Sequence, residues 1–395
     1  FGRLRAHAYL DVLNVTYPIV PDELAEFCAG KRAVLIVEEG QPDFIEQNIV
    51  TLLRRADLQT RVHGKDCLPM AGEYTGGVLR DGLRKFVERV APDMLAERAT
   101  PVAAAPAPAV QAAAQQVHPR PPSFCTGCPE RPIFTALKLV ERELGPHHVS
   151  CDIGCHLFSI LPPFEVGATT MGYGLGWAGA AALNTRETSK RTISFMGDGG
   201  FWHNGLTSGV GNAVFNKTDN VLVVVDNSYS AATGGQDVLS SRADNPIRAT
   251  RNPIEKAVRG VGVEWVRTVT HTYSIAEMRD TLREALTTKE SGPKVVIAQS
   301  ECMLNRQRRE KPKFRALVKS GGRAVRERFG VDPDTCTGDH SCIRLSGCPS
   351  LTIRDNPDPL RTDPIATVID SCVGCGLCGE VAHAAVLCPS FYRAQ

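Results

Sequence analysis

The amino-acid sequence lacks the features that mark membrane, secreted and nucleic-acid-binding proteins. Its apolar runs are all too short to cross a bilayer, and no secretory signal is recognisable. Charges of the two signs nearly cancel, giving a net charge of +2 and a pI near 8.0, so composition offers no argument for a nucleic-acid or acidic-surface partner. We therefore expect a cytoplasmic protein that has neither a membrane nor a nucleic acid as its partner.

An initiator methionine is also missing. The chain begins with Phe1, and we interpret it as a piece of a longer protein. Its 395 residues predict roughly two to three domains, each large enough to bury a core. What the chain has in quantity is cysteine, with 14 residues; without a secretory signal, this number favours metal ligation over disulfide bonds.

The most informative stretch is a pair of predicted buried strands, 192–196 and 221–225, with a helix predicted between them over 203–215. A strand, a helix and a strand with short connections form a parallel unit. Ligands of such units bind at the carboxyl ends of the strands. Asp198 follows the first strand and Asn227 the second, so their oxygen atoms are expected at one edge of the sheet.

Carboxylate and amide oxygens are hard ligands of the kind that magnesium prefers. Three glycines surround the aspartate: Gly197, Gly199 and Gly200. Glycine lets backbone approach a phosphate closely, and the following helix directs its N-terminus at the anion. The alternative is a simple glycine turn in a buried sheet, but a polar ligand on both strand ends favours a magnesium diphosphate site.

A second glycine motif lies upstream. Residues 174–179 spell GxGxxG, and Asp198 follows about twenty residues later, which is the outline of a dinucleotide fingerprint. That fingerprint requires a strand directly before its first glycine, and residues 162–170 make a poor strand. We therefore predict that these glycines serve close helix packing rather than nicotinamide binding.

The first domain is predicted over residues 1–96, and an alanine- and proline-rich tether over 97–120 separates it from the rest. Its α/β pattern consists of a strand at 33–37, a helix at 42–56, a strand at 58–63 and a helix at 78–90. Glu38 and Glu39 end the first strand. We interpret them as helix-capping or solvent-facing groups, with a functional role as the alternative.

The second domain is predicted over 121–305. Cys125 and Cys128 have the CxxC spacing of partners on one metal centre, although this motif alone also fits a redox or zinc site. Cys151 and Cys155 follow, and both fit an ordinary core position as well. Cys302 stands after a predicted strand at 294–298.

A basic segment over 306–330 is predicted to link the second and third domains. Ten Lys or Arg residues lie between 305 and 328. We interpret the segment as a solvated amphipathic helix and linker. The alternative is a surface that docks an acidic electron carrier or the phosphates of coenzyme A.

The third domain, 331–395, is rich in cysteine. Cys372-x2-Cys375-x2-Cys378 is the run that wraps one face of an iron–sulfur cubane. In ferredoxins with two clusters, the cysteine that precedes a proline serves the other cluster. Cys348 precedes a proline, and we therefore assign it to the cluster of this run.

The remaining tail cysteines are Cys336, Cys342 and Cys388. They form a second cluster site that lacks one thiolate. Asp339 stands where the middle cysteine of the run would be, and we predict it as the fourth ligand; the alternative is that it only hydrogen-bonds the loop, leaving the corner to water, to His340 or to nothing. The long gap between Cys378 and Cys388 departs from the simple ferredoxin pattern. Structural zinc is the alternative for the whole tail.

A thiamine-type site joined to such a tail resembles the 2-oxoacid:ferredoxin oxidoreductases. Within that family the chain is most similar to the C-terminal half of the indolepyruvate-type alpha subunits. The stretches that carry the resemblance are FCTGCPER, CDIGCHLFSILPPF, MGYGLG, GDGGFWHNGL, VVVDNSYSAATGGQ and the cysteine tail, with a weaker likeness in VLIVEEGQPDFIEQ. The resemblance implies an α/β fold: a thiamine-diphosphate-binding parallel-sheet domain, preceded by a small transketolase-C-like domain and followed by a ferredoxin-like iron–sulfur domain.

The resemblance also implies ligand sets. Magnesium would be held by Asp198, Asn227 and the carbonyl of Tyr229. The loop over the diphosphate would include Ser230, Thr233, Gly234 and Gln236. A proximal cluster would be held by Cys125, Cys128, Cys155 and Cys302. His203 would either face the thiazolium ring or pack at the helix start.

The activity that the resemblance implies is oxidative decarboxylation of a 2-oxoacid, an aryl pyruvate such as indolepyruvate, to acyl-CoA and CO2. Electrons would pass from thiamine diphosphate through three [4Fe–4S] clusters, one proximal and two in the tail, to ferredoxin. The glutamate that activates the cofactor would lie in a pyrimidine-binding domain, in the missing N-terminal part or in another chain. A smaller gamma- or beta-type subunit and an oligomer are also implied. The alternatives are a non-oxidative thiamine-dependent decarboxylase with a zinc tail, and an electron-transfer subunit with a cofactor-free thiamine fold.

Overall fold

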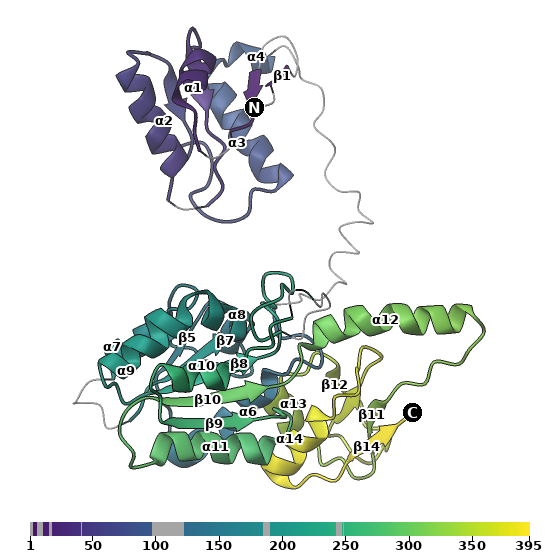
Figure 1. Ribbon diagram of the computed structural model, residues 1–395. Coiled ribbons are helices and arrows are strands. Elements are labelled where there is room, and N and C mark those ends of the chain that lie inside the picture. Colours follow the sequence, from purple (N-terminus) through teal and green to yellow (C-terminus); the bar gives the residue numbers. More distant parts are fainter. Residues whose placement is uncertain are drawn as a thin grey trace. The chain divides into compact units, whose positions relative to one another are not determined.

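The computed structural model describes residues 3–5, 11–15, 18–40, 42–96, 122–184, 190–241, 247 and 249–395 (Figure 1). The chain divides into two compact units, Phe1–Pro119 and Arg120–Gln395. The predicted tether at 97–120 lies outside the described residues. No helix within the described ranges has both the length and the apolar character needed to cross a membrane.

The first unit combines small sheets with helices. Its described strands are β1 (Arg3–Arg5) antiparallel to β2 (Asp11–Leu13), and β3 (Ala33–Leu35) parallel to β4 (Arg61–His63). Its described helices are α1 (Pro21–Cys28), α2 (Phe44–Arg55), α3 (Gly76–Val90) and α4 (Asp93–Ala96). All four elements predicted for this unit are present, with ends that differ by a few residues. The transketolase-C-like character of the unit stays a prediction.

The two acidic residues that end the first predicted strand have structural partners. The Glu38 carboxylate accepts hydrogen bonds from the backbone N–H groups of Ile45, at 3.0 Å, and Glu46, at 3.2 Å. These are orphan donors of the first turn of α2, so Glu38 caps that helix. The Glu39 carboxylate accepts from the backbone N–H of Tyr74 at 2.6 Å. The capping interpretation of Glu38 therefore agrees with the structure.

A six-stranded, wholly parallel sheet forms the centre of the second unit, in the order β6-β5-β7-β8-β10-β9. The strands are β5 (Val149–Cys151), β6 (Thr169–Thr170), β7 (Ile193–Gly197), β8 (Val221–Asp226), β9 (Trp265–Val269) and β10 (Lys294–Gln299). The strands β7, β8 and β10 are continuous apolar runs because both faces of the sheet are covered.

Helices pack on the two faces of this sheet (Figure 1). The helices α6 (Arg131–Leu144) and α11 (Ile275–Thr287) cover one face, and α7 (Gly176–Leu183), α9 (Asn212–Phe215) and α10 (Ile254–Gly260) cover the other. Alternate side chains of one strand enter opposite cores: Phe195 packs with α6, and Met196 packs with α7. This arrangement holds the carboxyl ends of the strands at one edge of a rigid sheet.

The helix after β7 begins earlier than predicted. The helical run starts at Asp198 with α8 (Asp198–Gly200), continues as the π-helix η2 (Phe201–Gly211) and ends with α9 at Phe215. The sequence predicted that the strand stops at these glycines and that a helix begins only at His203. The prediction missed the first turn because glycine is a poor helix former in isolation, whereas here strand β7 leads directly into the helix.

The upstream GxGxxG motif serves packing, as predicted. A Cβ at Gly176 would lie 2.8 Å from the backbone nitrogen of Asp152, at the end of β5. Gly174 adopts a φ of +81°, a conformation that glycine tolerates. The strand that precedes the motif, β6, has only two residues. The glycines thus allow α7 to approach the sheet closely.

The cysteine-rich tail is built from two antiparallel strand pairs and two helices. The pairs are β11 (Arg328–Val331) with β14 (Phe391–Ala394) and β12 (Leu351–Arg354) with β13 (Ile365–Val368). The helices are α13 (Ser341–Ser346) and α14 (Leu377–Val386). A basic helix, α12 (Met303–Lys319), precedes this tail, and among its residues only Met303 is buried. The predicted solvated helix is therefore present.

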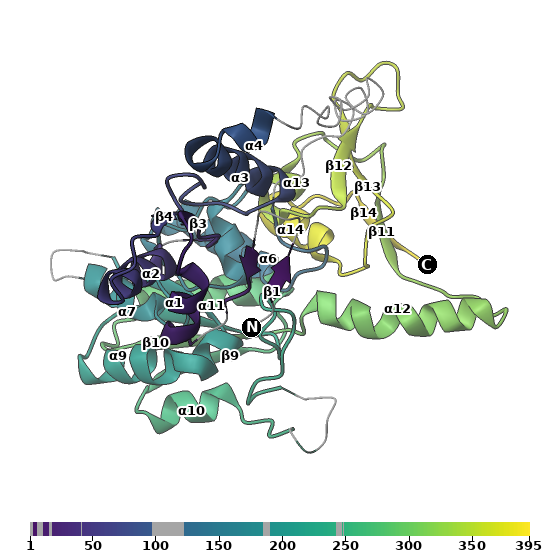
Figure 2. The ribbon, with the colours of Figure 1, turned by 90° about the horizontal axis from the view of Figure 1, so that it is seen from above.

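The tail packs onto the parallel-sheet domain. Figures 1 and 2 both show α13 and α14 beside α6, and these helices share a small apolar core. The members of that core are Leu139, Tyr273, Ile275, Leu345, Leu377 and Val381. The hydroxyl of Thr135 on α6 also donates to the carbonyl of Leu345 at 2.6 Å. The second and third predicted domains thus form one compact unit.

Candidate functional site

Two polar side chains meet at the edge of the sheet. Asp198 follows β7 and Asn227 follows β8, and the register of these strands pairs Gly197 with Val225. Both polar side chains are buried. The structure therefore brings the predicted carboxylate and amide oxygen to the carboxyl ends of adjacent strands.

The Asp198 carboxylate is incompletely satisfied by the protein. Its Oδ1 accepts a hydrogen bond from the backbone N–H of Gly199 at 2.8 Å, while its buried Oδ2 has no hydrogen-bond partner among the described residues. Burial raises the pKa of Asp198 well above its usual range, and the charge of Asp226 raises it further. Burying a charged group without a partner is costly. This donor set therefore fits a hard divalent cation such as Mg²⁺.

The neighbouring glycines make room for the protein's own side chains. A Cβ at Gly199 would lie 2.3 Å from Tyr173 Oη and 2.6 Å from Ser230 Oγ. A Cβ at Gly200 would lie 2.3 Å from Asp152 Oδ2. Glycine is needed at these positions because side chains from three other segments occupy the space of a Cβ. Close approach of the glycine backbone to a phosphate stays a prediction.

Asp152 is a site-forming residue that the sequence analysis missed. Its buried carboxylate accepts from the backbone N–H groups of Gly174, at 2.7 Å, and Ile153, at 2.8 Å. Burial raises the pKa of Asp152 to about 6, against these hydrogen bonds. The residue ties the turn before α7 to the end of β5, beside the start of the helical run. An aspartate directly after the short strand 149–151 was the available signal.

The predicted diphosphate loop is closed by its own side chains. Ser230 and Gln236 form a backbone bridge, and the Thr233 hydroxyl donates to Gln236 Oε1 at 2.6 Å. Gly234 has a φ of +115°. The loop thus presents a preformed polar surface after β8.

A pocket of about 760 Å³ lies between this loop and the helical run, and its lining includes His203, Gly199, Ser230 and Gln236. The His203 side chain is exposed, with its ring centroid 5.2 Å from that of Tyr173. His203 therefore lines the pocket wall rather than the packed interior of the helix start.

Four cysteines from three segments converge beside the Asp198 site. Cys125 and Cys128 precede α6, Cys155 begins the 3-10 helix η1 (Cys155–Ile160), and Cys302 immediately precedes α12. Electrostatic interactions link Cys155 with Cys128, Cys125, Cys302 and Asp198, and Cys302 with Cys125. Ligation of a proximal cluster by these four residues stays a prediction. Cys151 is not part of it: its buried thiol contacts the Ser159 hydroxyl at 3.7 Å, in an ordinary core position.

A buried acid accompanies this proximal set. Glu130 is buried, and its charge interacts with those of Cys128, Cys155 and Cys302. Burial raises the pKa of the Glu130 carboxyl to about 8. Burial also raises the pKa values of the three thiols. Thiolates at these positions require a compensating cation, which is what metal ligation supplies.

The tail cysteines fall into two groups, as predicted from their spacing. The inner set comprises Cys348, Cys372, Cys375 and Cys378, whose charges interact with one another. Here the cysteine–proline residue Cys348 joins the Cys372-x2-Cys375-x2-Cys378 run, despite lying on another segment. Iron ligation by these residues stays a prediction.

The outer set comprises Cys336, Cys342 and Cys388, which line a small pocket together with Asp339. Burial raises the pKa of Cys342 to about 12, with further contributions from the charges of Cys336, Cys388 and Asp339. The geometry thus places three thiols and one carboxylate around a common space.

The Asp339 carboxylate already has partners within its own loop. Its Oδ2 accepts from the Thr337 hydroxyl at 2.7 Å, and its Oδ1 accepts from the backbone N–H of Ser341 at 2.8 Å. The hydrogen bonds from Ser341 and Thr337 lower the pKa of Asp339 to about 2. His340 is held elsewhere, with Nε2 2.9 Å from the Pro364 carbonyl. Ligation of iron by Asp339 stays a prediction, and it would use the remaining lone pairs of the same oxygens.

We expect the outer set to hold a cluster with one labile corner, because a carboxylate is a harder and weaker ligand for iron than a thiolate. Mild oxidation of the anaerobically purified protein should then produce the electron paramagnetic resonance signal of a three-iron cluster. The signal should disappear in Asp339→Cys and persist in the control Asp334→Cys. A native protein that never shows the signal would rule out a labile corner.

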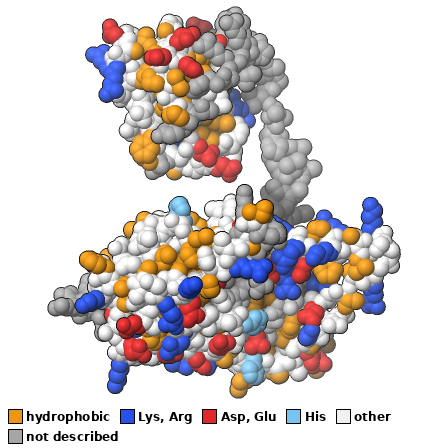
Figure 3. Space-filling model, in the orientation of Figure 1, with side chains coloured by type: hydrophobic (Ala, Val, Ile, Leu, Met, Phe, Trp, Pro, Cys, Tyr) orange, Lys and Arg blue, Asp and Glu red, His pale blue; other side chains and the backbone are white. Residues whose placement is uncertain are grey.

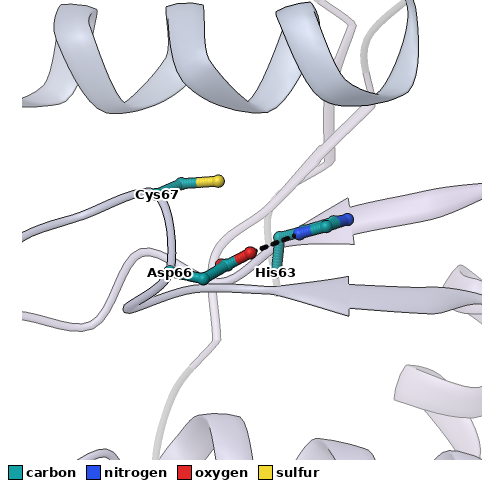
Figure 4. A group of neighbouring side chains, drawn as sticks. All are labelled: His63, Asp66 and Cys67. Atoms are coloured by element: carbon teal, nitrogen blue, oxygen red, sulfur yellow. Dashed lines mark hydrogen bonds and ion pairs between the residues drawn. The ribbon is translucent and has the colours of Figure 1, made fainter.

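A further group of possible ligands lies in the first unit and was not noticed in the sequence. The ligand atoms of His63, Asp66 and Cys67 all lie within 4.8 Å of one another (Figure 4). His63 Nδ1 is 2.7 Å from Asp66 Oδ2, and the Arg89 guanidinium also contacts that oxygen. Arg89 Nη1 is 3.8 Å from Cys67 Sγ. Arg89 therefore supplies the positive charge of this group.

Comparison with known proteins defines the class of the central domain. Residues 152–298 match the family described as the C-terminal TPP binding domain of thiamine pyrophosphate enzymes. The match spans the strands and loops that carry Asp198 and Asn227. The parallel-sheet domain thus has the fold of this family.

Over most of its length the chain is similar to curated IorA subunits of indolepyruvate oxidoreductases. It is 32% identical to indolepyruvate oxidoreductase subunit IorA of Methanothermobacter thermautotrophicus over 95% of its own length and 55% of the relative's. It is 30% identical to the IorA subunit of Thermococcus kodakarensis and 31% identical to that of Archaeoglobus fulgidus, over 93% and 94% of its length. The resemblance predicted from the motifs is confirmed. The chain spans about half the length of the curated relatives it matches.

Two solved structures are more distant. A 2-oxoglutarate:ferredoxin oxidoreductase from Magnetococcus marinus is 20% identical, with a TM-score of 0.40 over 47% of this chain and 66% of that chain. A putative thiamin diphosphate-dependent enzyme from Mycobacterium smegmatis is 15% identical, with a TM-score of 0.32 over 70% of this chain and 50% of that chain.

Proposed function

We propose that this chain forms the thiamine and iron–sulfur part of a 2-oxoacid:ferredoxin oxidoreductase that acts on an aryl pyruvate such as indolepyruvate. The observation that carries the proposal is the proximity of the thiol sets to the Asp198 site within one compact unit. Cys155 of the proximal set interacts with Asp198, and the tail that bears the inner and outer sets packs against the same domain. A cofactor site that adjoins a series of thiol sets suits a reaction whose electrons must leave one at a time.

The proposed reaction converts a 2-oxoacid and coenzyme A into an acyl thioester, CO2, one proton and two electrons. The bond between the oxo carbon and the carboxylate breaks, and a bond between the acyl carbon and the thiol sulfur forms. Two ferredoxin molecules each accept one electron. Iron–sulfur clusters are the one-electron carriers that such a division requires.

Asp198, Asn227 and the Tyr229 carbonyl would hold magnesium against the diphosphate. Thiamine diphosphate, when bound, supplies the electron sink that permits decarboxylation of a 2-oxoacid. The loop from Ser230 to Gln236 would then exclude water from the pocket that His203 lines. A pyrimidine-binding domain from another segment or subunit would supply the activating glutamate.

Coenzyme A has a candidate docking surface at the start of α12. Figure 3 shows Lys and Arg side chains gathered over this helix. Arg306 and Arg309 line a second pocket, of about 660 Å³, next to Met303, which directly follows Cys302 of the proximal set. Exposed ion pairs with Glu310 and Glu301 hold these arginines only weakly. The two guanidinium groups could therefore turn to phosphates.

Replacing both arginines, as Arg306→Gln with Arg309→Gln, should raise the KM for coenzyme A by roughly tenfold or more, since each hydrogen bond to a charged group contributes about 1.5–3 kcal/mol. The kcat should change little. The matched control, Lys313→Gln with Arg315→Gln, makes the same charge change one to three turns further along the exposed helix. Equal KM values for the two double variants would exclude docking at this pocket.

Metal and cofactor content of the native complex, purified without oxygen, tests the proposed function. We expect about twelve iron atoms per chain, four for each [4Fe–4S] cluster, together with thiamine diphosphate and indolepyruvate-dependent reduction of ferredoxin. A colourless protein that contains zinc would indicate the non-oxidative decarboxylase. Full iron without any binding of thiamine diphosphate would indicate the electron-transfer subunit.

A further inference from the structure

The first residue of α6 is a fully buried arginine. Arg131 has an exposed fraction of 0%, and its Nη1 donates to the Ser346 carbonyl of α13 at 3.1 Å. Its Nε and Nη2 have no hydrogen-bond partner among the described residues. Arginine stays protonated in proteins, so α6 begins with a permanent positive charge and unsatisfied donors inside the domain.

No carboxylate lies within ion-pair distance of Arg131 in the described part of the chain. The titratable groups that lie near enough to interact with Arg131 are instead three thiols and one phenol: Cys348, Cys375, Cys128 and Tyr273. The Tyr273 hydroxyl is itself engaged, since it donates to the Gly127 carbonyl.

The thiols around Arg131 belong to two different sets. Cys128 is a member of the proximal set, whereas Cys348 and Cys375 are members of the inner tail set. The contact between α6 and α13 that Thr135 supports keeps the guanidinium at this junction. A single cation is therefore shared by the two sets between which an electron would have to pass.

We propose that Arg131 is a positioning residue that serves as the shared counter-cation of the proximal and inner tail clusters. This inference rests on the proposed function, because it requires iron–sulfur clusters at both sets. A cluster gains one negative charge on reduction, and a fixed neighbouring cation stabilises that form. Arg131 therefore raises the reduction potentials of both clusters, and its Nε–H and Nη2–H are the donors available to their sulfur atoms.

Potentiometric titration of the native complex, monitored by electron paramagnetic resonance, tests this role. In Arg131→Gln we expect unchanged iron content but reduction potentials of the proximal and inner clusters that are lower by at least about 59 mV, a tenfold smaller ratio of reduced to oxidised cluster at a given potential. The outer cluster should not shift. Arg131→Lys, which keeps the charge, should stay closer to the wild-type protein. The control Arg142→Gln removes an exposed arginine from the last turn of the same helix.

Unchanged potentials in an iron-replete Arg131→Gln would overturn the proposal. Arg131→Met is a second neutral variant, and it leaves no buried amide unpaired. Unchanged potentials in an iron-replete Arg131→Met would likewise overturn the proposal. If both neutral variants lose the two clusters while Arg131→Lys retains them, the charge is needed for their assembly, which supports the proposal. If all three variants lose them, Arg131 acts through packing and the proposal fails. A wild-type protein without iron would refute the proposed function itself, independently of any variant.

Discussion

Asp198→Ala is expected to abolish binding of thiamine diphosphate and magnesium. The substitution removes the carboxylate whose buried Oδ2 lacks a protein partner, and with it the negative charge that holds the cation. Losing one member of a buried charge pair costs about 3–5 kcal/mol, which corresponds to on the order of a hundredfold to several thousandfold in affinity. Calorimetry with thiamine diphosphate and Mg²⁺ measures this loss directly.

The iron content of Asp198→Ala should equal that of the unmodified protein, because the thiol sets retain all their members. Asp280→Ala is the matched control, since it removes an exposed carboxylate from α11, away from the carboxyl ends of the strands. It should bind thiamine diphosphate normally. Tight binding of the cofactor by Asp198→Ala would exclude this aspartate as the magnesium ligand.

The double substitution Cys125→Ser with Cys128→Ser should remove one cluster and disconnect the cofactor from the tail. We expect a loss of about four of about twelve iron atoms per chain. The rate at which substrate reduces ferredoxin should fall by more than roughly 100-fold, because the missing cluster is the one beside Asp198. Loss of a residue that only hydrogen-bonds to a metal ligand already costs roughly 10–100-fold. Thiamine diphosphate should still bind.

The control for this variant is Cys28→Ser with Cys151→Ser, which changes two buried cysteines that occupy core positions. These belong to none of the three predicted sets, so the iron content should be unchanged. Iron analysis and reduction assays on both double variants separate a local effect from a general loss of cysteine. A Cys125 and Cys128 variant that retains all its iron and its reduction rate would mean that these residues bind no cluster.

Local sequence patterns were sufficient to predict much of the fold. The runs at 192–196, 221–225 and 294–298 become β7, β8 and β10. Each run is predominantly apolar, and this pattern is typical of a strand that is buried on both faces. Asp198 and Asn227 reach the same edge because parallel strands all end on one side. Such features depend on residues close together in the chain, so spacing alone determines them.

Packing changed the interpretation of several individual residues. The phosphate contact of Gly199 and Gly200 stays a prediction, and only the structure shows that Tyr173, Ser230 and Asp152, from other segments, face their Cβ positions. Asp339 stays a predicted iron ligand, and the structure adds that its carboxylate is hydrogen-bonded within its loop. The residue types were informative from the sequence, whereas these contacts are visible only in the structure.

The sequence by itself determined which ligand atoms are available and the order in which they occur. It identified hard oxygens after two buried strands, and cysteine runs whose local spacing suits a cluster. Only the tertiary structure decided how distant segments combine: that the tail helices pack on α6, and that Arg131 stands between two thiol sets. These contacts arise because α6 packs against both the sheet and the tail helices. The energetic effect of a buried charge depends on the groups that this packing places around it.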